Sequence, residues 1–339
     1  MKTHKIFSII LGVLISITAI YAFFWGVDIK IFSFNIKFEK VDFSSIYTTL
    51  KSINIYYFIL AFIFSQITFI FRAIRLWLIL KSIKENVSLW DSIIFTILGF
   101  GGNNILPLRG GEALKAFSIY KKTGISFVSA TNSVIIERIY DTINLGIFIL
   151  FILFFMNISE NKFLAKYFID LKEFAIYASL FFIFLFIFLL SIDKIEFFKR
   201  KKSNKIIIEV LRFKHMILPN FNLFVFMILI TILLWFSLDL GIYFLFKAFH
   251  MNLSIIAGVL LETLLSVSVA LPSTPGFLGV FQVAVELILK TFSISISTST
   301  IKSFAILLWI VQIIPITFLF IITISLLPEY LSKDFNNEI

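Results

Sequence analysis

The sequence contains no cysteine and only three histidines among its 339 residues. The lack of cysteine excludes a disulfide framework, thiolate catalysis and a metal site with thiolate ligands. The three histidines, His4, His215 and His250, lie far apart in the sequence and do not have the spacing of metal ligands. The sequence therefore predicts no metal and no cofactor, and it argues against a metalloenzyme.

Charged residues are also scarce, at 15% of the chain, whereas hydrophobic residues make up 60% and phenylalanine alone occurs 45 times. So few polar side chains cannot cover a water-exposed surface, which indicates an integral membrane protein. A helix needs roughly 20 apolar residues to cross the hydrocarbon core of a bilayer. Such runs lie at residues 6–25, 53–71, 127–156, 174–192, 221–249 and 303–327. The predicted fold class is all-α, a polytopic membrane helical bundle of about six full spans.

Shorter apolar runs at 89–106, 254–271 and 277–292 predict two helical hairpins that return to their own side of the membrane. The net charge is +10, and the basic residues lie mostly between the apolar runs. This distribution follows the positive-inside bias, so no nucleic-acid partner is expected. With a cytoplasmic N terminus, the inner segments hold about twice as many Lys and Arg as the outer ones. We therefore expect a multi-pass protein of a prokaryotic cell membrane, with its two re-entrant hairpins entering from opposite faces, as in an inverted repeat.

Each hairpin contains a helix break made of proline and glycine. The first break, at 103–112, contains Pro107, Gly110 and Gly111, and the second, at 268–282, contains Pro272, Pro275, Gly276 and Gly279. A broken helix leaves backbone N–H and C=O groups without partners, which lipid tolerates only where the backbone is buried in protein or lines a polar cavity. Two breaks in one chain indicate a substrate pathway.

Polar residues flank both breaks. Asn103 and Asn104 precede the first break, and Arg109 and Glu112 follow Pro107. New helix amides near Gly110, together with Arg109, would hold an anion such as a phosphodiester. The alternative is a plain loop whose Arg109 obeys the positive-inside bias.

The second break offers hydroxyls and an amide rather than a cation, namely Ser273, Thr274 and Gln282. Other polar side chains stand alone in apolar sequence, and interhelical hydrogen bonding is the role expected for each of them. They are Gln66, Asp239, Glu262 and Gln312.

The run at 127–156 contains Glu137, Arg138 and Asp141, in which the two acids are four residues apart and share one helix face. A charge at membrane depth costs roughly 2.5–3.5 kcal/mol on insertion scales, so it normally faces the bundle interior and is paired. One interpretation is structural: Arg138 pairs with Asp141, and Glu137 pairs with another helix. The other is a substrate or proton pathway, in which Glu137 and Asp141 carry a coupling proton.

The chain is predicted to be a single membrane domain over 1–339. It divides into half-repeats at 1–192 and 221–327, which are joined by a basic loop at 193–220. No soluble catalytic domain is recognisable in the sequence, and the chain is not expected to be an enzyme.

Four motifs occur in a fixed order along the chain. They are Leu-Pro-x-Arg-Gly-Gly-Glu-x-x-Lys-Ala from Leu106, Lys-Lys-Thr-Gly-Ile-Ser from Lys121, Glu-Arg-x-x-Asp from Glu137 and Leu-Pro-x-x-Pro-Gly-x-Leu-Gly-Val-Phe from Leu271. This series resembles the flippase-like membrane domain of lysylphosphatidylglycerol synthases, in a stand-alone form without the soluble transferase domain. The last motif departs from the family pattern at Gln282, where relatives often have glutamate.

The resemblance implies a transporter that moves an anionic or aminoacylated phospholipid, or a lipid-linked intermediate, between leaflets. The partners it implies are membrane lipids, including polyprenyl-phosphate-linked substrates, and a second copy of the chain is a further candidate. The site residues it implies are Arg109, Glu112, Glu137, Arg138 and Asp141. Two other functions remain open: an integral-membrane transferase acting on lipid-linked substrates, and a transporter of small solutes.

Overall fold

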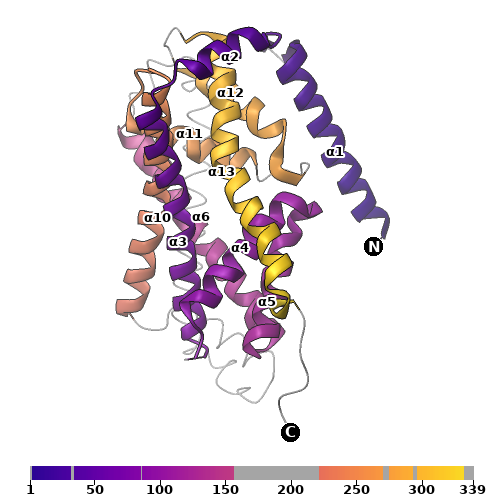
Figure 1. Ribbon diagram of the computed structural model, residues 1–339, viewed down its shortest axis with the longest axis vertical. Helices are drawn as coiled ribbons and strands as arrows, with labels where there is room; N and C mark the ends of the chain where they lie inside the picture. The colour runs from indigo at the N-terminus through magenta and orange to yellow at the C-terminus, as the bar shows by residue number, and fades with distance from the viewer. Residues whose placement is uncertain are drawn as a thin grey trace.

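The computed structural model describes residues 2–31, 34–84, 86–155, 221–269, 275–292 and 296–331 (Figure 1). The predicted span at 174–192, the basic loop at 193–220, and Pro272, Ser273 and Thr274 lie outside the described residues.

The described chain is a helical bundle, which confirms the predicted all-α membrane fold. Its helices are α1 (Lys2–Trp25), α2 (Phe43–Lys51), α3 (Ile55–Lys81), α4 (Leu89–Ile105), α5 (Gly110–Thr123), α6 (Phe127–Phe155), α10 (Phe221–Ala248), α11 (Ile255–Ser268), α12 (Val280–Thr291) and α13 (Thr298–Leu326). Three short 3-10 turns are η1 (Pro107–Arg109), η4 (Pro275–Phe277) and η5 (Pro328–Tyr330).

Among the described helices, α3, α10 and α13 are long and apolar enough to cross a membrane. Helix α6 has 29 residues and carries its charged residues near the middle. The count of six spans and the division into inverted halves stay predictions.

Helix α3 is longer than the sequence indicated. The apolar run was expected to end at residue 71, but α3 continues to Lys81 and contains Arg72 and Arg75. Both arginines are buried, at 8% and 0% exposure, so counting them among the basic residues of the inner segments between the spans was wrong. Lys115 and Lys302 are buried as well, at 2% and 1%. When these four residues are left out of the count of Lys and Arg between the spans, the inner segments still hold more of them than the outer ones. The cytoplasmic N terminus stays a prediction.

The two predicted hairpins are present as helix pairs. Helices α4 and α5 pack against each other in the lower half of the bundle, and α11 and α12 pack in the upper half (Figure 1). The turns η1 and η4 contact each other, so the two breaks meet inside the bundle. Entry of the hairpins from opposite membrane faces stays a prediction.

A short antiparallel hairpin was not predicted. Strands β1 (Val27–Ile31) and β2 (Phe34–Phe38) follow α1, with Ile29 opposite Ile36. Together with α2 they lie at one end of the bundle (Figure 1).

Helix α1 is attached to the last part of the chain. The ammonium of Lys302 on α13 donates to the carbonyl oxygen of Phe23 and forms an ion pair of 3.2 Å with Glu286 on α12. A side chain at Gly279 would collide with the backbone of Ser16 and Ile20, so the glycine allows α1 to approach α12 closely.

The apolar core has two main clusters with polar residues between them. Along α3, Ala61 belongs to the cluster built around α10 to α13, and Leu76 belongs to the cluster around α4 and α5. Along α13, Leu308 and Phe320 belong to the same two clusters in turn. The segments between these residues line a cavity.

Candidate functional site

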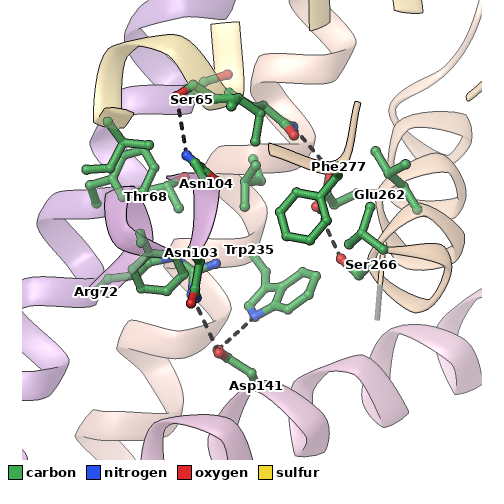
Figure 2. Close-up of a pocket in the computed structure, with 18 of the residues that line it drawn as sticks. Ser65, Thr68, Arg72, Asn103, Asn104, Asp141, Trp235, Glu262, Ser266 and Phe277 are labelled. Atoms are coloured by element: carbon green, nitrogen blue, oxygen red, sulfur yellow. Dashed lines mark hydrogen bonds and ion pairs between the residues drawn. The ribbon is translucent and has the colours of Figure 1, made fainter. Parts of the chain in front are cut away.

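A cavity of about 310 Å³ lies between the two core clusters (Figure 2). Its walls come from α3, α4, α6, α10, α11, α12 and α13 and from the turns η1 and η4. Thr68, Trp235 and Gln312 line it, and each lies near the middle of its helix. The cavity is therefore at the depth expected for the centre of a membrane.

Asp141 on α6 is the centre of a cationic wall of the cavity. Its carboxylate forms ion pairs with Arg75 at 2.8 Å, Arg72 at 3.5 Å and Arg138 at 3.6 Å. The indole Nε1 of Trp235 also donates to Asp141, at 3.4 Å. The predicted pairing of Arg138 with Asp141 is confirmed, and the two arginines from α3 are a part of the wall that the sequence analysis missed.

Two further ion pairs join α5 to α6. The Lys115 ammonium lies 2.5 Å from Glu137, and the Glu112 carboxylate lies 2.6 Å from Arg138. Glu137 is thus paired with another helix, as the structural interpretation predicted. Neither Glu112 nor Glu137 lines the cavity; Glu112 contacts it only through Arg138, and Lys115, the partner of Glu137, does not line it either.

The cavity wall has more cations than acids. Arg72, Arg109 and Arg138 line it, against the carboxyls of Asp141 and Glu262, and Arg75 supports Asp141 from behind. The Nε of Arg138 is buried and has no hydrogen-bond partner among the described residues. An uncommitted guanidinium donor on a net positive wall favours an anion with several oxygen acceptors, such as a phosphate.

Arg109 connects the two helix breaks. Its Nη2 donates a hydrogen bond of 2.8 Å to the carbonyl of Val269, the residue that ends α11, and its guanidinium lies 5.8 Å from the centre of the Phe277 ring in η4. Leu108 and Arg109 both have left-handed backbone, with φ of 54° and 55°. Such strain in residues with side chains typically occurs at functional sites.

Helix α5 begins at Gly110, as predicted, but its first glycines pack rather than line the cavity. A side chain on Gly111 would collide with the backbone of Gly99 and Gly102 on α4. The anion site expected at the amides of this helix stays a prediction, and the guanidinium of Arg109 is the part of it that reaches the cavity.

The carbonyls freed at the breaks and kinks are bonded by side chains from other helices. Pro315 interrupts α13 and cannot donate to the carbonyl of Val311, and the amide of Gln66 on α3 donates to that oxygen at 2.9 Å. Likewise, the indole of Trp309 donates to the carbonyl of Gly276 at 2.7 Å. Gln66 therefore has the interhelical role expected for it.

The asparagines of the first break differ in their contacts. Asn104 donates to the hydroxyl of Thr317 on α13 at 2.9 Å, whereas the Oδ1 of Asn103 is buried without a described partner. Both line the cavity. Asn103 is thus the member of the pair with an uncommitted polar atom.

Gln282 does not line the cavity. Its Oε1 accepts a hydrogen bond of 2.7 Å from the N–H of Gly279 and so caps the start of α12. Gly276 and Gly279 have φ of 70° and 87°, which is why glycine is needed at these turns.

An acidic pole lies across the cavity from the cationic wall. Glu262 accepts hydrogen bonds from Ser266 at 3.3 Å and from Gln312 at 3.4 Å, which confirms interhelical bonding for Gln312. Asp239 has no such bond among the described residues. In the part of the chain that the structure describes, no three His, Asp or Glu side chains are grouped to hold a metal ion.

The chain matches the family described as the lysylphosphatidylglycerol synthase TM region over residues 9–319. It is 30% identical over 196 residues to UPF0104 membrane protein MJ1078 of Methanocaldococcus jannaschii. The aligned residues make up 58% of this chain and 81% of that relative. UPF0104 membrane protein MJ1595 of the same organism is 28% identical over 126 residues, or 37% of this chain and 38% of the relative. Both names describe a membrane protein.

Proposed function

Because the chain belongs to the family of the lysylphosphatidylglycerol synthase TM region, we propose that it moves the head group of an anionic or aminoacylated phospholipid, or of a lipid-linked phosphate, between leaflets. The observation that carries this proposal is the net cationic cavity at the mid-length of apolar helices. A phosphate that crosses a bilayer must replace its bound water by other hydrogen-bond donors. A guanidinium group can donate two parallel hydrogen bonds to the oxygens of one phosphate.

The size of the cavity supports a head group as the transported part. About 310 Å³ is at the lower end of ligand pockets and has no room for two acyl chains as well. The chains would stay in the lipid while the phosphate passes Arg72, Arg109 and Arg138. Relative movement of the α4–α5 and α11–α12 hairpins would open the cavity to one leaflet and then to the other.

Transport is favoured over catalysis by the way the acid beside the cavity's arginines is held. A general acid or base needs a carboxyl or histidine that is free to exchange a proton with the reacting group. On the cationic wall, Asp141 is instead held by three guanidinium groups. We therefore propose a transporter rather than an enzyme, located in the cell membrane with a cytoplasmic N terminus.

The experiment that tests this function uses purified protein in sealed liposomes with phosphatidylglycerol that carries a fluorescent head-group label. A membrane-impermeant reductant bleaches the outer leaflet, and movement appears as bleaching beyond the outer half. We expect this second phase with protein and not in protein-free vesicles. If folded protein moves neither phosphatidylglycerol, nor its aminoacylated form, nor a polyprenyl phosphate, the proposal is wrong. Escape of trapped glycerol phosphate without lipid movement would instead identify a small-solute transporter.

A further inference from the structure

The acidic pole of the cavity differs from the cationic wall, because no cation from the described residues is bound to it. Figure 2 shows Glu262 and Ser266 on α11 across the cavity from Arg72 and Asp141. The carboxyl of Glu262 is 7% exposed and lines the cavity, and its partners Ser266 and Gln312 are neutral donors. No ion pair of Glu262 occurs in the described part of the chain. Glu262 is therefore an acid within reach of whatever enters the cavity.

A second acid lies behind the first. Asp239 on α10 is 0% exposed, and neither of its carboxyl oxygens has a hydrogen bond or ion pair with any described residue. It lies within electrostatic range of Glu262. Two buried negative charges within electrostatic range of each other, with no cation bound to either, are very unfavourable, and buried acids in this situation take up a proton instead.

Among the described residues, the cation that acts on the acidic pole is Arg72 on α3. Arg72 is within electrostatic range of Glu262, but its guanidinium already contacts Asp141. Arg75 and Arg138 are bound to Asp141 in the same way. Helix α13 faces Glu262 with the neutral amide of Gln312. These arginines are thus bound to Asp141 rather than to Glu262. An incoming anion would compete with Asp141 for them.

We propose that Glu262, backed by Asp239, binds the proton that crosses the membrane together with an anionic head group. This inference rests on the proposed function and adds the ion whose movement is coupled to that of the lipid. An incoming phosphate binds Arg72, so that Arg72 no longer stabilises the negative charge of Glu262. The phosphate also brings its own negative charge close to the carboxylate of Glu262. A proton from water then binds a carboxyl oxygen of Glu262, and it returns to water when the head group leaves. Because such coupling is reciprocal, a bound proton increases the affinity for the phosphate by the same factor.

The acids that the sequence indicated for this role, Glu137 and Asp141, are unsuited to it. Glu137 is held at 2.5 Å by Lys115, and Asp141 is held at 2.8 Å by Arg75. Protonating either one would leave its buried cation without a counter-charge. Glu262 loses no ion pair when it takes up a proton.

The test measures phosphatidylglycerol movement in liposomes at several pH values, equal on both sides, and with an imposed potassium diffusion potential. In the wild type, one proton accompanies one anionic head group. Above the pH at which Glu262 releases its proton, the rate of movement should therefore fall by about tenfold per pH unit. The rate should not respond to the membrane potential. Glu262→Gln mimics the protonated acid, so its movement should no longer depend on pH and should now respond to the potential.

Two variants complete the test. Glu39→Gln removes an exposed acid that does not line the cavity and should keep the wild-type pH profile. Asp239→Asn should shift the pH profile without removing it, and it serves in place of Glu262→Gln if that variant does not fold.

Three outcomes would overturn the inference. One is a Glu262→Gln variant with the wild-type pH and potential dependence. Another is an Asp239→Asn variant with an unshifted profile. The third is a Glu262→Gln variant that loses only the movement of aminoacylated phosphatidylglycerol, because the acid would then bind a head-group ammonium. A wild type that moves no lipid contradicts the proposed function itself.

Discussion

The guanidinium of Arg109, in the first helix break, donates a hydrogen bond of 2.8 Å to the main-chain carbonyl of Val269, where α11 ends before the second break. One side chain therefore both lines the cavity and holds the two hairpins together. A phosphate that competes for this guanidinium would weaken the contact between the hairpins. Binding of a head group and release of one hairpin from the other are thus linked through Arg109.

Replacing Arg109 should stop head-group movement with little loss of folded protein. Arg109→Ala removes a charge-assisted hydrogen bond, typically about 1.5–3 kcal/mol, so we expect the rate to fall at least about tenfold. Arg109→Lys keeps the charge but not the planar pair of donors and should retain part of the rate. The measurement is the liposome bleaching assay, with gel filtration to show folded protein.

The backbone at Arg109 requires a second variant as a control. Because its φ is 55°, alanine is strained there, whereas asparagine adopts this conformation more readily. Arg109→Asn should therefore be as inactive as Arg109→Ala but more stable. Full transport activity in either variant would show that Arg109 is not part of the anion site.

Gln66 should be needed only because Pro315 is present. Gln66→Leu leaves the buried carbonyl of Val311 without a donor, which should cost about 1–3 kcal/mol of unfolding free energy. In the Pro315→Ala background, the restored N–H of residue 315 bonds to Val311, and Gln66→Leu should cost less. Unfolding of the four proteins in detergent, followed by circular dichroism, measures this coupling. Equal costs in both backgrounds would disprove the link.

Lys115 and Glu137 should behave as a structural pair rather than a transport pair. Lys115→Met or Glu137→Leu alone leaves a buried charge unpaired and should cost about 3–5 kcal/mol, whereas the double variant should cost less than either. Since neither side chain lines the cavity, the double variant should still move lipid. A double variant that folds but moves no lipid would show that the pair is needed for transport, as in the alternative in which Glu137 belongs to a substrate or proton pathway.

The close contact of α4 with α5 predicts that Gly111 is intolerant of substitution. Gly111→Ala places a methyl group against the backbone of Gly99 and Gly102, which cannot yield as a flexible side chain would. We expect a loss of about 1–3 kcal/mol from overpacking. Gly146→Ala on α6 is the matched control, because its added methyl meets nothing within 4 Å. A melting temperature lowered equally in both variants would exclude overpacking as the cause.

The local features of the site could be predicted from the sequence. Pro107 and Gly110 mark the end of one helix and the start of the next, because their backbone preferences act within a few residues. The spacing of Arg138 and Asp141 fixed their mutual contact for the same reason. These inferences need no knowledge of which helices pack together.

The partners contributed by other helices could not be predicted. Arg72 and Arg75 follow an apolar run and look like the basic end of a span, and only the packing of α3 against α6 places them at Asp141. The pairing of Lys115 with Glu137 depends in the same way on how α5 packs against α6. Gln282 had a readable signal, since a glutamine three residues after a glycine at a helix start fits a capping contact.

The attachment of α1 has a consequence for how the protein is made. Helix α1 is translated before the other described helices, yet two of the residues it contacts, Gly279 at the start of α12 and Lys302 on α13, are translated much later. These two contacts of α1 can form only after α12 and the start of α13 have been synthesised. Of the described helices, the first to be translated is therefore among the last to complete its contacts, and truncation before Lys302 would remove one of them.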